Sequence, residues 1–469
     1  MLHRLTFVFG SLLLVPCLLG QVHPRETFKD PSNLERYAVH CAPCHGARGR
    51  GDGPAARFLD PIPRDFAAGR FKLVSTVSGR PARADLAQSI RHGMPGTAML
   101  SFDHLGDEAI EGLTDMVLAF RRDGLTALLA PEASTEEELD DWLREELNAG
   151  PPIAIPKVPT WTAEAAARGR LSYLTLCSRC HGPDGRANHP PPLLPEGDEP
   201  YFPRDLGLGV LKGGNTPVDL FRRIRCGMPG TVMPSVSPEV LPDGEVWDLV
   251  AFLQTLIPER TQAISLPRGV PIRPTRIEPP CPTRADDPRL ANLPTFPVPV
   301  VPFRRDEATV SGLLVQAATD GTHLIFRLRY GDATRNPSTV AALSPPDGVA
   351  IRLSALAHPP VLPIPGQPLP MDRALWLAGS MPEEHDPVFD GKTPRFVNPD
   401  SVCKSPIGPE RVGDGSWRDQ VWTVLLPLRP ERSRDLSGLG PKAVSFAIFD
   451  GHHARGPLPA AFSPWCPLE

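Results

Sequence analysis

A five-residue motif, C-x-x-C-H, occurs twice in this 469-residue chain and constrains its fold more than any other feature. The first copy begins at Cys41 and the second at Cys177, and similar sequence follows each copy. A Pro-Arg-Asp element comes next, and then IRHGMPGTAM, which ends at Met99, or IRCGMPGTVM, which ends at Met233. Self-similarity of this kind marks repeated structural units, so the first half of the chain is expected to hold two domains of one fold.

Both repeated units are expected to be all-α. Apolar residues recur at helical spacing after the last methionine of each unit: Ile110, Leu113, Val117 and Phe120 in the first, and Val246, Leu249, Val250 and Leu253 in the second. A helical segment also leads into each C-x-x-C-H motif, and Thr162 is a candidate N-cap for the second.

The C-x-x-C-H spacing suits covalent attachment of haem. Two thiols three positions apart reach the two vinyl groups of one porphyrin, and the adjacent histidine lies beneath the iron. The sequence therefore predicts two c-type haems, bound through Cys41, Cys44, Cys177 and Cys180, with His45 and His181 as iron ligands. A redox dithiol or half a zinc site is the alternative for C-x-x-C alone, but both copies carry the histidine and neither has a second ligand pair nearby.

Methionine is the expected sixth ligand, and each unit offers two. Met94 and Met228 precede the Pro-Gly turn, whereas Met99 and Met233 follow it, where the chain returns over the haem face. We therefore assign Met99 and Met233 as ligands. Iron held between His and Met has no open position, which suits electron transfer rather than substrate binding.

The Pro-Arg-Asp element supplies one arginine to each unit. Arg64 and Arg204 are candidates for pairing with the haem propionates. A salt bridge within the loop, to Asp65 or Asp205, is the alternative.

The N-terminal residues indicate export. Arg4 precedes an apolar run from Leu5 to Leu19, which is shorter than the roughly 20 residues that a membrane-spanning helix needs. Residues 1–20 are therefore expected to form a secretory signal peptide, with a retained anchor as the alternative. The protein is expected to be periplasmic or otherwise exported, and peripheral to a membrane at most.

The remaining cysteines and the charge add two expectations. Four of the nine cysteines lie outside the haem motifs and the signal, namely Cys226, Cys281, Cys403 and Cys466. In an oxidising compartment they allow up to two disulfides, of which we expect Cys403 with Cys466; free buried thiols are the alternative. The net charge of −5 and the lack of a basic stripe indicate no nucleic-acid partner.

Proline marks the domain boundaries, because the chain has 60 prolines, about two to three times ordinary usage. An acidic helical stretch from Glu136 to Leu147 is interpreted as a solvated face, with a docking patch for a basic partner as the alternative. In the last third, strands are expected at 310–332, 421–428 and 443–451, which indicates a β-sandwich. The expected units are the two helical repeats at 32–123 and 161–257, linkers at 124–160 and 258–286, and a sandwich at 287–469.

The two repeats resemble class I cytochrome c domains. The resemblance covers residues of about 32 to 123 and 164 to 257, and it rests on C-x-x-C-H, the PRD(F/L) element and the G-x-PGT-x-M(P) loop. Leu100 replaces the usual proline after the first ligand methionine, whereas the second unit keeps Met233-Pro234.

The last third is similar to the haem-binding domain of ethylbenzene dehydrogenase γ subunits, through LLVQAATDGTHLIFRLRYGDATRN, DGVAIRLS, LPMDRALWLA, GDGSWRDQVWTVLLPLRP and AVSFAIFDG. That family holds a b-type haem between Met and Lys, and Met371 matches the Met. The Lys would fall at Ala460, and no Lys occurs from Phe446 onward; His452 or His453 are the alternatives. The resemblance implies either a third haem or a sandwich that serves only as a docking module.

These features predict a periplasmic di-haem cytochrome that relays electrons. The resemblance implies a subunit of a respiratory molybdopterin oxidoreductase complex, of the nitrite/nitrate oxidoreductase kind. Its partners would be the catalytic and iron–sulfur subunits and a cytochrome or oxidase acceptor. The alternative is a di-haem enzyme, such as a peroxidase or a sulfur-compound dehydrogenase, for which Cys226 is a candidate ligand. No Ser-His-Asp order, Walker loop, HExxH motif or Rossmann fingerprint occurs, and no catalytic residue is assigned.

Overall fold

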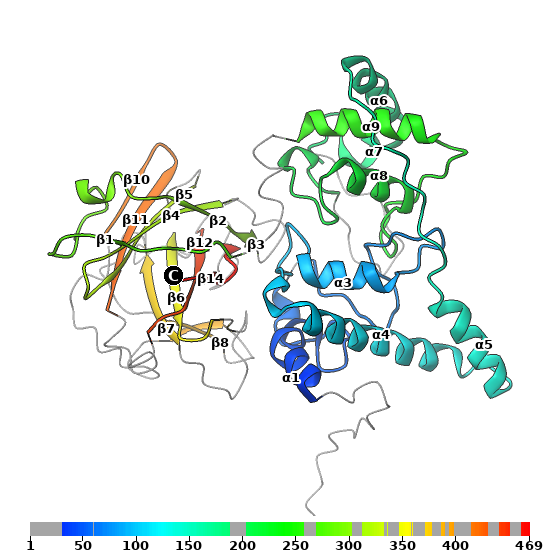
Figure 1. Ribbon diagram of the computed structural model, residues 1–469, viewed down its shortest axis with the longest axis horizontal. Helices are drawn as coiled ribbons and strands as arrows, with labels where there is room; N and C mark the ends of the chain where they lie inside the picture. The colour runs from blue at the N-terminus through cyan, green and yellow to red at the C-terminus, as the bar shows by residue number, and fades with distance from the viewer. Residues whose placement is uncertain are drawn as a thin grey trace, which may run out of the picture.

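The chain folds into two helical units and one unit of β-strands (Figure 1). The computed structural model describes residues 31–59, 61–187, 203–257, 269–302, 312–332, 335, 347–357, 359, 371–377, 386–389, 394–397, 414–429, 440–450 and 461–469. The expected signal peptide lies outside these residues, as do Cys17, Cys403, His452, His453 and Ala460.

The first helical unit comprises α1 (Pro31–His40), α2 (Ala42–His45), η2 (Ala56–Phe58), α3 (Arg83–His92), η3 (Asp103–Leu105), α4 (Asp107–Leu129) and α5 (Glu136–Leu147). The predicted face of α4 is buried, with Ile110 0% and Leu113 1% exposed. This helix continues past residue 123, where we expected the domain to end, because Leu125 is still buried.

The acidic stretch forms α5 with the predicted bounds. Its N-cap Thr135 accepts a hydrogen bond from the N–H of Glu138, at 3.1 Å. The helix is anchored on the first unit, because Leu143 is buried and Arg121 of α4 donates to the carbonyl of Glu146 at 2.7 Å. Its acidic side chains face outward on a helix that is packed rather than free.

The second helical unit comprises α6 (Ala163–Leu176), α7 (Ser178–His181), η4 (Leu206–Leu208), α8 (Pro217–Cys226) and α9 (Asp243–Leu256). Thr162 caps α6 as predicted, since its hydroxyl accepts from the N–H of Ala165 at 3.1 Å. The core holds the rings of Phe221 and Trp247, whose centroids lie 4.4 Å apart. The two units therefore repeat one arrangement: a helix, a short helix carrying the motif, and two packed helices.

The β-strand unit contains two sheets and a separate hairpin. Its elements are β1 (Thr275–Arg276), η5 (Pro288–Leu290), β2 (Phe296–Pro299), β3 (Val301–Pro302), β4 (Gly312–Thr319), β5 (Leu324–Gly331), β6 (Gly348–Ser354), β7 (Met371–Leu377), β8 (Asp386–Phe389), β9 (Pro394–Val397), β10 (Asp414–Arg418), β11 (Val421–Leu428), β12 (Ala443–Phe449), β13 (Ala461–Phe462) and β14 (Cys466–Pro467). One sheet has the order β1-β4-β5-β11-β10 with β2 beside β4, and the other has β3-β13-β12-β6-β7 with β14 beside β12.

The two sheets share one hydrophobic core. Phe326 of β5 and Phe446 of β12 are both 0% exposed, and their rings meet edge to face at 5.7 Å. The predicted hairpin is present, because β4 and β5 pair antiparallel with Thr319 opposite Leu324. Alternation of buried and less buried residues along β11 fits a strand with one face in this core.

Part of the expected linker at 258–286 belongs to this unit. Strand β1 pairs in parallel with β4, and Ile272 is fully buried, with its N–H donating to the carbonyl of Pro467 at 2.8 Å. The boundary at residue 287 was therefore placed too late. The sequence around β1 is rich in proline and lacks the alternation of apolar and polar residues that is typical of a strand. The pairing of β1 with the distant strand β4 therefore could not be predicted from the local sequence.

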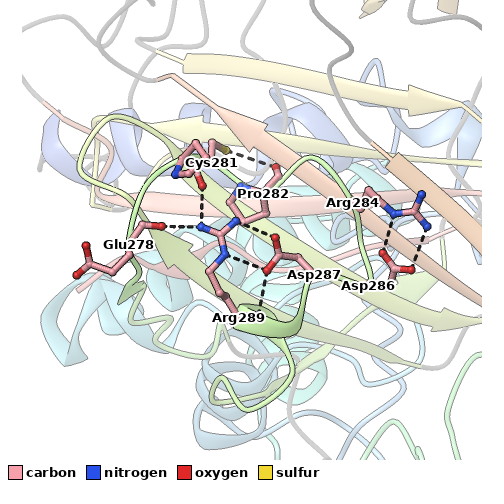
Figure 2. A network of polar contacts seen from close by, with 8 residues as sticks. Glu278, Cys281, Pro282, Arg284, Asp286, Asp287 and Arg289 are labelled. Carbon is pink, nitrogen blue, oxygen red and sulfur yellow. Dashed lines mark hydrogen bonds and ion pairs between the residues drawn. The ribbon is translucent and has the colours of Figure 1, made fainter.

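Arg289 holds the loop that follows β1 (Figure 2). Its guanidinium donates to the carbonyl oxygens of Glu278 at 2.6 Å and Pro280 at 2.7 Å. The same side chain pairs with Asp287 at 2.7 Å. These contacts give two backbone carbonyls of this proline-rich loop a hydrogen-bond donor.

The β-strand unit packs against the first helical unit. Leu59 and Leu100 of the helical unit form one buried cluster with Val301 and Phe462 of the β-strand unit, and Cys44 packs against it. Figure 1 places β3 on the side of the β-strand unit that faces the helical units.

Candidate haem sites

The histidine of each motif is held by the Pro-Arg-Asp element. His45 Nδ1 lies 3.0 Å from the carbonyl oxygen of Arg64, and His181 Nδ1 lies 3.1 Å from that of Arg204. Because a carbonyl only accepts, Nδ1 carries the proton and Nε2 keeps its lone pair for a metal. In the first unit the ring of Phe66 also stacks on His45, with centroids 4.4 Å apart.

Burial keeps these groups uncharged. It lowers the pKa of His45 to about 4 and also lowers the pKa of His181. Burial raises the pKa of the Cys41 and Cys44 thiols to about 12 and that of Cys177 to about 11. A redox dithiol needs a thiolate near neutral pH, so these surroundings suit an uncharged sulfur such as a thioether better than a redox dithiol.

A tyrosine on the helix before each motif closes the turn behind it. The Tyr37 hydroxyl donates to the carbonyl of Gly46 at 2.8 Å, and the Tyr173 hydroxyl donates to that of Gly182 at 2.7 Å. Both glycines have φ near +78°, at +78° and +77°. A side chain at either position would be strained, so the glycine after the histidine is part of the motif's geometry.

The methionine loop has the same geometry in both units. The N–H of Met94 donates to the carbonyl of Met99 at 2.9 Å, and that of Met228 donates to Met233 at 3.0 Å. The Thr97 hydroxyl closes the first loop by donating to the Met94 carbonyl at 2.7 Å. Each pair of methionines therefore flanks one tight turn.

A cavity lies beside the first motif, and both methionines reach its wall together with both motif cysteines and the histidine. The wall is mostly apolar, and its members are Tyr37, His40, Cys41, Cys44, His45, Leu59, Pro61, Ile62, Pro63, Arg64, Phe66, Phe71, Lys72, Leu73, Leu86, Ser89, Ile90, Met94, Thr97, Ala98, Met99, Leu100, Phe102, Leu113, Val117 and Lys212. The assignment of Met99 over Met94 stays a prediction, because both line the cavity.

A haem fits this donor set. The wall offers two thiols, a neutral histidine and thioethers for iron, and apolar side chains for the porphyrin faces. Arg64, Lys72 and Lys212 supply cations that suit propionate groups. The carboxylate of Asp65 accepts from the backbone N–H of Ala67 at 2.8 Å.

The second site repeats the local bonds of the first. Cys177, Cys180, His181 and Met233 are all partly exposed. Residues 188–202 of its loop lie outside the described part of the chain, so its wall is described only in part. Arg204 Nε donates to the carbonyl of Val210 at 3.0 Å within the same loop.

Three other residues singled out from the sequence lie away from the two motifs. Cys226 is buried, and its Sγ lies 4.0 Å from the carbonyl oxygen of Thr76, between the two helical units. Met371 begins β7, opposite Ser354 of β6, and its side chain lies outside the described residues. Cys466 is buried, and its pairing with Cys403, which lies outside the described residues, stays a prediction.

Lys72 and Lys212 were not singled out from the sequence. They follow the Pro-Arg-Asp element of their units at the same distance, so the repeat itself contained the signal. Nothing in the sequence indicated that a lysine of the second unit would line the cavity of the first.

A comparison with known proteins finds a family match in each of the two helical units. The family model of cytochrome c oxidase, cbb3-type, subunit III matches the chain twice, over residues 33–115 and 164–253. A solved structure from Kuenenia stuttgartiensis, a reducing HAO-like protein complex, has a chain 28% identical to this one. The alignment covers 49% of this chain and 97% of that chain, with a TM-score of 0.42. No curated protein matches the chain.

Residues 33–115 and 164–253 are cytochrome c domains. A cytochrome c domain carries covalently bound c-type haem, and the chain is accordingly a haem cytochrome of electron transfer. Within the part of the chain that is described, no helix is both long and apolar enough to span a membrane.

Proposed function

We propose that this chain is an exported di-haem cytochrome that relays electrons within a respiratory redox complex. One haem is attached through Cys41 and Cys44, and the other through Cys177 and Cys180. His45 and His181 are the proximal ligands, and Met99 and Met233 complete the two iron sites.

One observation carries this proposal. The histidine is oriented by the carbonyl of the Pro-Arg-Asp arginine in both units, at 3.0 Å and 3.1 Å. The methionine loop is closed by the same backbone bond in both, at 2.9 Å and 3.0 Å. Two sites built alike, each with its own methionines, favour a relay over an enzyme with one relay haem and one open catalytic haem.

The β-strand unit favours a fixed place in a complex. A free electron carrier needs no such unit, and this one is packed on the first cytochrome unit through Leu100 and Phe462. By resemblance we propose that it is a sandwich of the ethylbenzene dehydrogenase γ kind, docked to a molybdopterin oxidoreductase of the nitrite/nitrate oxidoreductase type. Its partners are then a catalytic and iron–sulfur complex and a cytochrome or oxidase acceptor. A b-type haem at Met371 is a further part of this proposal.

The count of haems is tested first. A pyridine haemochrome assay before and after acid–acetone extraction separates covalent from extractable haem in the full-length exported protein. We expect two covalent haems per chain, with an extractable third if Met371 ligates a b-type haem. One covalent haem, or none, would overturn the relay.

The partner is tested by gentle purification from the native host. We expect a large molybdenum-containing subunit to accompany the cytochrome. Recovery of the cytochrome alone, with molybdenum in other fractions, would count against the complex while leaving the two haems untouched.

A further inference from the structure

The two cytochrome units meet through the same segments of each. The guanidinium of Arg204 lies against the turn at Gly96, so closely that a Cβ at Gly96 would overlap it. In the opposite direction, a Cβ at Gly230 would lie 3.6 Å from Nη1 of Arg64. Gly96 and Gly230 are equivalent in the repeat and share φ of +73°. The Pro-Arg-Asp arginine of each unit thus reaches the methionine loop of the other.

Arg223 ties this interface together. Its Nη1 donates to the carbonyl of Lys72 at 2.9 Å in the first unit, and also to that of Gly227 at 3.0 Å in its own methionine loop. The carbonyl of Val74 lies 3.4 Å from Nη2. Burial lowers the pKa of Arg223, which is the cost of holding a cation between the units. These hydrogen bonds from one partly buried guanidinium hold the two units in a fixed relative position.

As a result, Lys212 of the second unit reaches the cavity of the first. It lines the same wall as Lys72, its equivalent in the repeat, and Arg64. The first site is therefore incomplete without the second unit.

We propose that Lys212 is a positioning and charge-setting residue of the first haem, supplied by the second cytochrome domain. This rests on the proposed function, since it takes the cavity beside Cys41 and Cys44 as the site of a haem. A cation beside the haem disfavours the ferric state, which carries one more positive charge than the ferrous state. Lys212 therefore raises the reduction potential of the first haem, and Arg204 braces the loop that carries its methionines.

The test compares three variants of the full-length, haem-loaded protein: Lys212→Gln, Lys72→Gln and Lys157→Gln. Lys157 is exposed in the segment between the units and is not among the residues that line the cavity, so its replacement removes the same charge outside the cavity wall. Each variant is titrated spectroelectrochemically, and its thermal unfolding is recorded to show that the fold is kept. The wave of the second haem is identified as the one that moves in Met233→His.

We expect Lys212→Gln and Lys72→Gln to shift the same wave, that of the first haem, to lower potential. Lys157→Gln should shift neither. A shift of the second haem's wave, or of no wave, in Lys212→Gln would overturn the inference while two covalent haems remain. Failure of the proposed function is seen separately, because the protein would then lack two covalent haems and two waves.

Discussion

Leu100 and Pro234 occupy the same position in the two cytochrome repeats, yet Leu100 is 4% exposed and Pro234 lies on the surface. Leu100 lines the cavity beside the first motif, and the β-strand unit also packs Val301 and Phe462 on it. The departure from the usual Met-Pro sequence in the first unit thus has a structural reason, because Leu100 supplies apolar surface to a contact between units.

This contact predicts the effect of Leu100→Asp. A carboxylate without a partner is costly to bury, so the variant should loosen the β-strand unit from the first cytochrome domain. A loss of about 1.4 kcal/mol in the free energy of the contact raises the population of the opened form tenfold. We therefore expect limited proteolysis to release the β-strand unit roughly tenfold faster or more. Pro234→Asp, at the equivalent exposed position, is the matched control and should change nothing. Equal release rates in the two variants would contradict the contact.

The choice between the two methionines predicts different spectra for their leucine variants. Met99→Leu should leave the first iron without its sixth ligand, and the reduced protein should then bind carbon monoxide at one haem. Met94→Leu should keep a low-spin iron, because the loop bond from its N–H to the Met99 carbonyl involves the backbone alone. The reverse pattern would assign Met94 instead. Carbon monoxide binding to the unaltered protein would favour the di-haem enzyme.

The N-cap of α6 predicts a modest loss of stability in Thr162→Ala. The Thr162 hydroxyl accepts from the N–H of Ala165, and removal of such a cap costs about 1 kcal/mol. Thr175→Ala, on the exposed face of the same helix, should cost less, because alanine favours the helix interior. Urea unfolding of the haem-loaded protein, followed by circular dichroism, compares the two. A larger loss in Thr175→Ala would contradict the cap.

The sequence predicted the features that depend on local spacing. The acidic helix has its expected bounds of Glu136 to Leu147, and Thr162 caps α6, because charge, periodicity and capping act within a few residues. The hairpin around Asp320-Gly321 was predicted for the same reason.

Features that depend on distant segments were not predictable. Strand β1 lies in a proline-dense segment and exists because β4 pairs with it in parallel. The place of Lys212 depends on how two domains pack, and the repeat predicts each domain without predicting their arrangement. The assignments of the haem ligands stay predictions that the variants above test.

The paired tyrosines give a last prediction that uses the repeat as its own control. The hydroxyls of Tyr37 and Tyr173 donate to Gly46 and Gly182 at 2.8 Å and 2.7 Å, and both rings are buried. Replacement by phenylalanine removes one of two hydrogen bonds to each buried carbonyl, because a backbone N–H three residues later also donates to it. One hydrogen bond of this kind contributes about 0.5–1.5 kcal/mol to stability. We expect each of Tyr37→Phe and Tyr173→Phe to lower the urea concentration at which its own unit unfolds, as reported by the haem of that unit.

The measurement follows the absorbance of each haem during unfolding, with the two distinguished by their potentials in partly reduced protein. Because each bond lies within one unit, Tyr37→Phe should act on the first haem and Tyr173→Phe on the second. The double variant should lose the sum of the two, since well-separated sites are additive within about 0.3–0.5 kcal/mol. If both variants lowered the stability of the first unit alone, the two motifs would not be closed alike. The second cytochrome domain would then be stabilised mainly by its contacts with the first.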